Sequence, residues 1–229
     1  AALLMAFLLF PRRQPPASTG GKLFDFRPVL RNRSAMAYSI GYCAHTWEMF
    51  VLRSWVVTFL VFSMHVHGSK VSWLIPTVVA MLMEVIGTVF SVLGNEMAVR
   101  FGRRRWILLV MCISIVCALG LGFVSGISYW ATVTACLVYN AFIYADSASL
   151  TAGAVGSAEP ERKGATMAMH ALLGYSGGFV GPLTLGVMLD LMGGETVFSW
   201  GIGFAHVAII MLVGPTALLI LKPRDLEGD

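Results

Sequence analysis

Three ionisable side chains, His45, Glu48 and Arg53, lie within one apolar stretch of the sequence, residues 36–64. In a segment that spans a bilayer such groups are costly, so they usually belong to a substrate or ion pathway. A carboxylate in this setting can carry a proton or bind a cation, and a guanidinium can bind a carboxylate through two parallel hydrogen bonds. The three residues therefore predict proton or ion chemistry beside a site for a charged solute.

Helical spacing indicates how these residues are arranged. His45, Glu48 and Trp55 follow one stripe of a helix. Arg53 lies about 140° around the axis from Glu48 and roughly 7 Å further along it. The two are not a direct i,i+4 pair, so both are expected to face one wide polar cavity. The alternative is that Glu48 and Arg53 neutralise partners on adjacent helices.

Residues 129–152 contain a second polar stripe. Asn140 and Tyr144 recur on one helical face, and Tyr139 and Asp146 recur on the adjacent one. A transmembrane helix this polar along one side must face water or protein rather than lipid chains. Asp146 is expected to have either a structural role near the lipid headgroups or a role in transport.

Six apolar stretches must hold these residues, and each approaches or exceeds the ~20 residues that cross a bilayer as a helix. They are residues 36–64, 71–93, 106–125, 129–152, 165–190 and 197–221. The chain of 229 residues is 57% hydrophobic and only 12% charged, whereas a soluble domain carries about 25% charged residues. The sequence predicts an all-α membrane protein, a polytopic bundle of six transmembrane helices.

The basic residues are distributed unevenly around such a bundle. Of the 16 Lys and Arg residues, 14 fall in segments that would lie on one side: Arg12, Arg13, Lys22, Arg27, Arg31, Arg33, Arg100, Arg103, Arg104, Arg105, Arg162, Lys163, Lys222 and Arg224. Because an excess of Lys and Arg marks the cytoplasmic side, both ends of the six-helix unit are expected in the cytoplasm, at the plasma membrane. The spread over several loops beside lipid headgroups argues against nucleic acid as a partner.

The first 35 residues do not fit the six-helix unit. Residues 1–10 are apolar, but as a helix they would cover only ~15 Å, about half a bilayer. Basic residues follow this run rather than precede it. We interpret 1–10 as the end of a preceding transmembrane helix, 11–35 as a cytoplasmic linker, and 36–229 as a C-terminal six-helix half with a short cytoplasmic tail. A short interfacial anchor is the alternative for 1–10.

Small residues mark where helices are expected to pack closely. Gly177, Gly181 and Pro182 lie in the fifth apolar stretch. The glycines would let a neighbouring backbone approach, and the proline would bend the helix. Glu84 and Gly87 share one face of the second stretch, so Glu84 is expected to point between helices rather than at lipid.

The loop expected between the second and third stretches, residues 94–105, is similar to a signature of the major facilitator superfamily of transporters, roughly G-x-x-x-D-R-x-G-R-R. The matching residues are Arg100, Gly102, Arg103 and Arg104. Val99 replaces the acidic residue, and Asn95 stands where the first glycine belongs. Residues 159–164 and the pattern Gly177-x-x-x-Gly181-Pro182 also resemble this family. The chain therefore resembles the C-terminal half of such a transporter, with residues 94–105 as a gating loop.

This resemblance implies that two six-helix halves rock about a shared site and expose it to each side of the membrane in turn. The implied substrate- and ion-binding residues are Tyr42, His45, Glu48, Arg53, Trp55, Glu84, Tyr139, Asn140 and Tyr144. Arg53 would anchor a carboxylate or other anionic group of a small organic solute. Glu48 would bind the coupled proton or cation, in symport or antiport. A missing N-terminal half would be the partner, and neither enzymatic activity nor a cofactor or metal is expected.

Three other interpretations fit the sequence less well. An exporter of lipophilic cations would use Glu48 or Glu84 as counter-charge, but Arg53 argues against a purely cationic site. A haem-binding redox subunit would need histidines at matched depths, and these are not evident among His45, His65, His67, His170 and His206. At positions 170 and 206 a hydrogen bond to a neighbouring carbonyl is the expected role. A free-standing six-helix protein would pair with a copy of itself. No hydrolase, zinc-protease or phosphate-loop motif occurs, and the four cysteines lack metal-site spacing.

Overall fold

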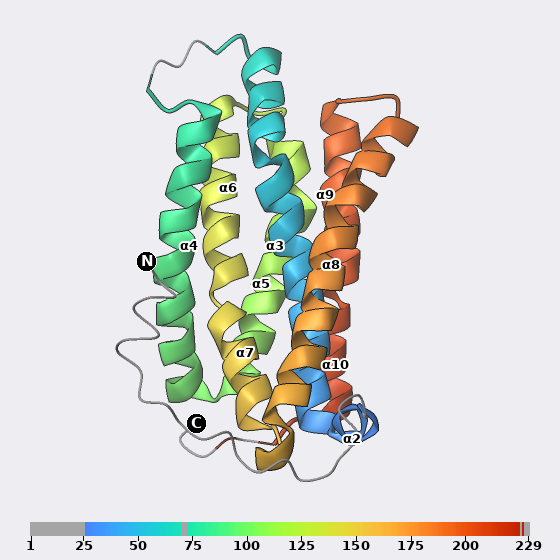
Figure 1. Ribbon diagram of the computed structural model, residues 1–229. Coiled ribbons are helices and arrows are strands. Elements are labelled where there is room, and N and C mark those ends of the chain that lie inside the picture. Colours follow the sequence, from blue (N-terminus) through green and yellow to red (C-terminus); the bar gives the residue numbers. More distant parts are fainter. Residues whose placement is uncertain (1–25, 70–72, 225, 227–229) are drawn as a thin grey trace, which may run out of the picture.

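The computed structural model describes residues 26–69, 73–224 and 226, and these residues form an all-helical bundle (Figure 1). Its helices are α2 (Arg27–Arg31), α3 (Arg33–Val66), α4 (Pro76–Phe101), α5 (Arg103–Val124), α6 (Tyr129–Tyr144), α7 (Ser147–Gly156), α8 (Lys163–Leu191), α9 (Val197–Met211) and α10 (Val213–Leu221). A 3-10 turn, η1 (Pro160–Arg162), precedes α8. The predicted all-α membrane bundle is confirmed. The interpretation of residues 1–10, and of most of the linker, lies outside the described residues.

The chain runs up and down the bundle six times, and the ends that carry the basic residues gather at one end of it (Figure 1). This basic end holds the start of α3, the α4–α5 turn, the α7–α8 connection and the end of α10. The linker predicted to run to residue 35 instead contains α2, and α3 already begins at Arg33. The reason is local, because the Asn32 side chain accepts a hydrogen bond from the Ala35 amide and caps α3.

The predicted loop at residues 94–105 is wrong as a loop. Helix α4 continues to Phe101, α5 begins at Arg103, and only Gly102 lies between them. Gly102 has φ +87°, a conformation that favours glycine. An exposed i,i+4 ion pair between Glu96 and Arg100, with 2.9 Å between Oε1 and Nη2, supports the last turns of α4.

The fourth predicted span, 129–152, is not one helix. It consists of α6 and α7, separated at Ala145 and Asp146. Five helical segments are each long and apolar enough to cross a membrane within the described part of the chain, and the pair α6–α7 is not among them. In Figure 1 the two short helices follow one another along the bundle, so together they cover the depth that was expected of one helix.

Helix α3 is the centre of the bundle, with contacts to α4, α6, α7, α8, α9 and α10. It comes closest to α8 at the glycines. A Cβ atom at Gly177 would lie 2.3 Å from the Cys43 carbonyl oxygen, and one at Gly181 would lie 2.9 Å from that of Trp47. Small residues at these positions therefore let the two backbones touch.

Large apolar side chains cover much of the outside of the bundle. Exposed examples on α4, α5 and α8 are Met81, Val85, Val92, Val116, Leu172, Phe179, Leu183 and Leu191. A soluble monomer rarely exposes apolar surface so continuously. Inside, Phe59 packs against Trp200 and Phe204 with ring-centre distances of 4.9 and 5.1 Å. The bundle is thus apolar both inside and out, as expected of a protein surrounded by lipid.

Candidate functional site

A cavity of about 290 Å³ lies between α3, α4 and α6 and contains an ion pair. Arg53 of α3 and Glu84 of α4 face each other in it, with 3.2 Å between Nε and Oε1. The Tyr144 hydroxyl donates to the other Glu84 oxygen at 3.4 Å. The side chains of Arg53 and Glu84 are 53% and 43% exposed, so a solute that enters the cavity can reach both charges.

The wall of this cavity is formed where α4 and α6 pack closely. Asn140 donates from Nδ2 to the Met83 carbonyl oxygen at 2.7 Å. One turn along α4, a Cβ atom at Gly87 would lie 2.8 Å from the Tyr144 ring. These contacts fix the Tyr144 ring against α4, and they place Glu84 between α4, α6 and α3.

Glu48 lies in a different environment, inside the bundle. Its carboxylate accepts a hydrogen bond from the Ser114 hydroxyl of α5 at 2.6 Å, and the buried Tyr139 hydroxyl lies next to the same group. Glu48 is 1% exposed, and it is not among the described residues that line the Arg53 cavity. Arg53 and Glu48 therefore lie on one helix but in two separate polar environments, rather than in the one wide cavity suggested by the sequence.

A second buried polar pair lies one helical turn from Glu48. His45 Nδ1 and Asp146 Oδ1 are 2.8 Å apart, and both side chains are almost fully buried. Asp146 occupies the break between α6 and α7, so the pair joins that break to α3. We refer to His45, Glu48, Ser114, Tyr139 and Asp146 as the buried polar layer. Sequence reasoning missed Ser114, although a lone hydroxyl within the apolar run of α5 was the available signal.

The remaining predicted site residues hold α3 against α8. The ring of Tyr42 stacks on His170 at 4.1 Å. His170 has Ser39 and Thr151 hydroxyls at 3.3 and 3.4 Å from its two ring nitrogens, rather than the carbonyl expected from the sequence. Trp55 Nε1 donates to the Pro182 carbonyl oxygen at 3.0 Å.

The histidines of the haem alternative have partners within the protein. His206 contacts the Gly203 carbonyl oxygen, as expected, and also accepts from Trp47 Nε1 at 3.3 Å. His67 Nε2 lies 2.8 Å from the Ser125 carbonyl oxygen. With the contacts of positions 45 and 170, these are interactions that a haem iron would have to displace, so the arrangement does not favour that alternative.

The family-like segment is anchored by Arg103. This residue is buried, and its Nη1 donates to Asn95 Oδ1 at 3.0 Å and to the Ser149 carbonyl oxygen at 3.4 Å. Asn95, which departs from the family pattern, thus supplies a partner for the arginine. Arg104 is half-buried and Arg100 is exposed, so of the three arginines Arg103 is the one that ties the α4–α5 turn to α7.

Comparison with known proteins gives one match. The model of a family described as Major Facilitator Superfamily matches residues 1–182, which is well over half of the chain. No match was found among curated proteins. The family match agrees with the helical bundle, its apolar exterior and the charged cavity between its helices. The chain belongs to the Major Facilitator Superfamily and is part of an integral membrane transporter.

Proposed function

We propose that this chain is the C-terminal half of a proton-coupled transporter for a small organic solute that carries a carboxylate or other anionic group. An N-terminal six-helix half would complete it, and the two would expose the shared site to each side of the plasma membrane in turn. The observation that carries the proposal is the Arg53–Glu84 pair, which is half exposed in a cavity between three helices.

Arg53 is the anchor for the solute. A guanidinium binds a carboxylate through two hydrogen bonds, and a substrate carboxylate would displace that of Glu84. Since Glu84 already satisfies the cation in the empty site, the anion must offer better geometry to bind. This competition would select for a planar carboxylate over a simple halide. It also disfavours a lipophilic cation as the substrate, because Arg53 would repel it.

Glu48 is the proposed proton site. Its described neighbours at hydrogen-bond distance are hydroxyls, and no Lys or Arg pairs with it in the described part of the chain. A buried carboxylate in such surroundings is costly to keep charged, so proton binding there is coupled to how the helices pack. Glu48 and Arg53 both belong to α3. A movement of α3 that follows solute binding at Arg53 would therefore change the surroundings of Glu48.

Transport by the intact protein in membrane vesicles tests this proposal. Uptake of a panel of labelled organic carboxylates and of a cationic dye is measured with and without a pH gradient. We expect gradient-driven uptake of a carboxylate and a loss of about 30-fold or more in kcat/KM for Arg53→Gln, from the ~2 kcal/mol of a charge-assisted hydrogen bond. Arg53→Lys retains the charge but not the fork, so it should lose most of the same activity.

Glu48→Gln should abolish the dependence on the pH gradient while carboxylate exchange continues. Glu96→Gln is the matched control, because Glu96 is an exposed acid near the basic end of α4. Unchanged gradient dependence in Glu48→Gln would remove the proton role from this residue. Uptake of the dye, with no carboxylate transported, would favour an exporter of cations instead.

A further inference from the structure

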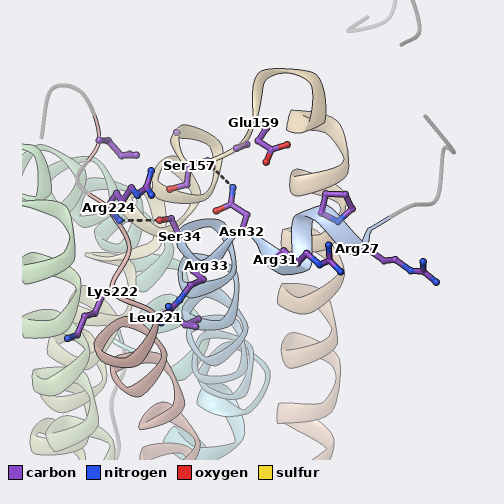
Figure 2. Close-up of a pocket in the computed structure, with 14 residues that line it drawn as sticks. Arg27, Arg31, Asn32, Arg33, Ser34, Ser157, Glu159, Leu221, Lys222 and Arg224 are labelled. Atoms are coloured by element: carbon purple, nitrogen blue, oxygen red, sulfur yellow. Dashed lines mark hydrogen bonds between the residues drawn. The ribbon is translucent and has the colours of Figure 1, made fainter. Parts of the chain in front are cut away.

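A second and larger concave surface lies at the basic end of the bundle, away from the Arg53 cavity (Figure 2). Its volume is about 1320 Å³, and it is formed by α2, the first residues of α3, the end of α7 and the residues after α10. Five cationic side chains line it: Arg27, Arg31, Arg33, Lys222 and Arg224. We call it the basic pocket.

The basic pocket has a large excess of positive charge. Among the described residues that line it, Glu159 supplies the one carboxylate. That carboxylate is already paired with Arg162, whose Nε lies 3.3 Å from Oε2 and which is not part of the lining. The pocket therefore offers several cations to a ligand and little negative charge to repel it. An anionic group is the chemistry that fits.

The walls of the pocket are held by hydrogen bonds between distant parts of the chain. Asn32 Nδ2 donates to the Ser157 carbonyl oxygen at 2.7 Å, as Figure 2 shows. The Arg224 amide donates to the Ser34 hydroxyl at 3.1 Å, and Arg33 Nη2 donates to the Ile220 carbonyl oxygen at 3.2 Å. Because the backbones that carry the cations are fixed in advance, a ligand has less to order when it binds.

The position of α2 indicates where the anion comes from. This short helix buries Val29 against the bundle and leaves Leu30 53% exposed between Arg27 and Arg31. An exposed apolar side chain flanked by arginines is suited to the boundary between acyl chains and headgroups. The excess of Lys and Arg at this end also places it on the side that faces anionic lipids.

We propose that the basic pocket binds the phosphate of an anionic phospholipid headgroup, with Leu30 against the acyl chains. The lipid would join α2 to the ends of α7 and α10, three segments that are distant in sequence. This site is separate from the solute cavity and does not depend on the transported substrate. Arg31 and Arg224, on opposite sides of the pocket, should contribute most directly.

Lipid retention by the intact transporter tests the proposal. Purified protein is titrated with phosphatidylglycerol or phosphatidylcholine, and bound lipid is counted by native mass spectrometry. The double variant Arg31→Gln/Arg224→Gln should weaken phosphatidylglycerol binding about 25-fold, from a roughly fivefold effect of each cation at a lipid surface. The matched control Arg105→Gln/Lys163→Gln removes two exposed cations from the same end but outside the pocket, and it should change binding less than twofold.

Three results would overturn the proposal. Equal losses in the pocket variant and the control would mean that the lipid responds only to overall charge. Binding of inorganic phosphate that blocks phosphatidylglycerol, with the same dependence on Arg31 and Arg224, would assign the pocket to a soluble anion. If phosphatidylglycerol bound only after neutralisation of the acidic tail by Asp225→Asn, Glu227→Gln and Asp229→Asn, the tail itself would be the occupant. A preference for phosphatidylglycerol over phosphatidylcholine that disappears in the pocket variant alone supports the proposal.

Discussion

The substitution Gly177→Ala should separate α8 from α3. A Cβ atom at this position would lie 2.3 Å from the Cys43 carbonyl oxygen and 3.1 Å from the Thr46 hydroxyl. The first contact is with backbone, which cannot rotate away as a side chain can. Because real Cβ atoms essentially never approach closer than 3.0 Å, α8 must move from α3 by about 0.7 Å at this point.

The size of the effect follows from three contributions. Overpacking of a fitted interface costs about 1–3 kcal/mol. The same displacement stretches the hydrogen bond from the Thr46 hydroxyl to the Gly174 carbonyl oxygen, now 2.6 Å, at a cost of about 1 kcal/mol. Alanine is better than glycine within a helix by about 1 kcal/mol, which opposes both. The net expectation is a loss of about 1–3 kcal/mol in the free energy of unfolding.

Gly120→Ala is the matched control, because a Cβ atom at Gly120 in α5 would have nothing within 4 Å. It should gain up to about 1 kcal/mol from helix propensity alone. Thermal unfolding of the intact transporter in detergent, followed by tryptophan fluorescence, should then give Tm values that differ by roughly 6–12 °C between the two variants. Equal Tm values would refute the reasoning, since they would show that the α3–α8 contact yields without cost.

Two further predictions concern the polar contacts at the break between α6 and α7. Asp146→Ala leaves the buried His45 without its partner and should lower the unfolding free energy by about 1–3 kcal/mol; the double variant His45→Leu/Asp146→Leu should recover part of this loss in a double-mutant cycle, and additive losses would mean that the pair is not coupled. Arg103→Lys cannot hold both Asn95 and Ser149, so amide hydrogen exchange in α7 should become faster by about tenfold, equivalent to one charge-assisted hydrogen bond; unchanged exchange would show that Arg103 does not fix α7.

The broken helix shows what the sequence could and could not predict about the fold. Apolar length predicted the membrane-crossing segments, since that signal is local and each segment must cover the same bilayer. Neither Ala145 nor Asp146 is a helix breaker, so the break had no local signal. It is a tertiary feature: Trp106 Nε1 donates to the Ala145 carbonyl oxygen at 3.0 Å, and Asp146 contacts His45. The break between α9 and α10, by contrast, had a local signal in Pro215.

The candidate site illustrates the same limit. Arg53, Glu84 and Tyr144 were each selected from the sequence, but by separate criteria: a buried charge, a shared face with glycine, and a polar stripe. Nothing in the sequence paired Arg53 with Glu84, because that contact depends on how far α3 and α4 are rotated about their axes. The same rotation buries Glu48 against Ser114 rather than in the cavity. Residue type and spacing thus predict which side chains are functional candidates, whereas helix orientation decides which of them meet.

The contacts at the break have a consequence for how the family-like segment could influence the interior. Helix α4 touches the break directly, since a Cβ atom at Gly94 would lie 1.9 Å from the Ala145 carbonyl oxygen. Arg103 binds the Ser149 carbonyl oxygen on the other side of the break, and Asp146 within it holds His45. His45 is one helical turn from the proposed proton site. A displacement of the α4–α5 turn therefore has to break these contacts or carry the break with it. In either case it changes the surroundings of the buried polar layer, through packed atoms at every step.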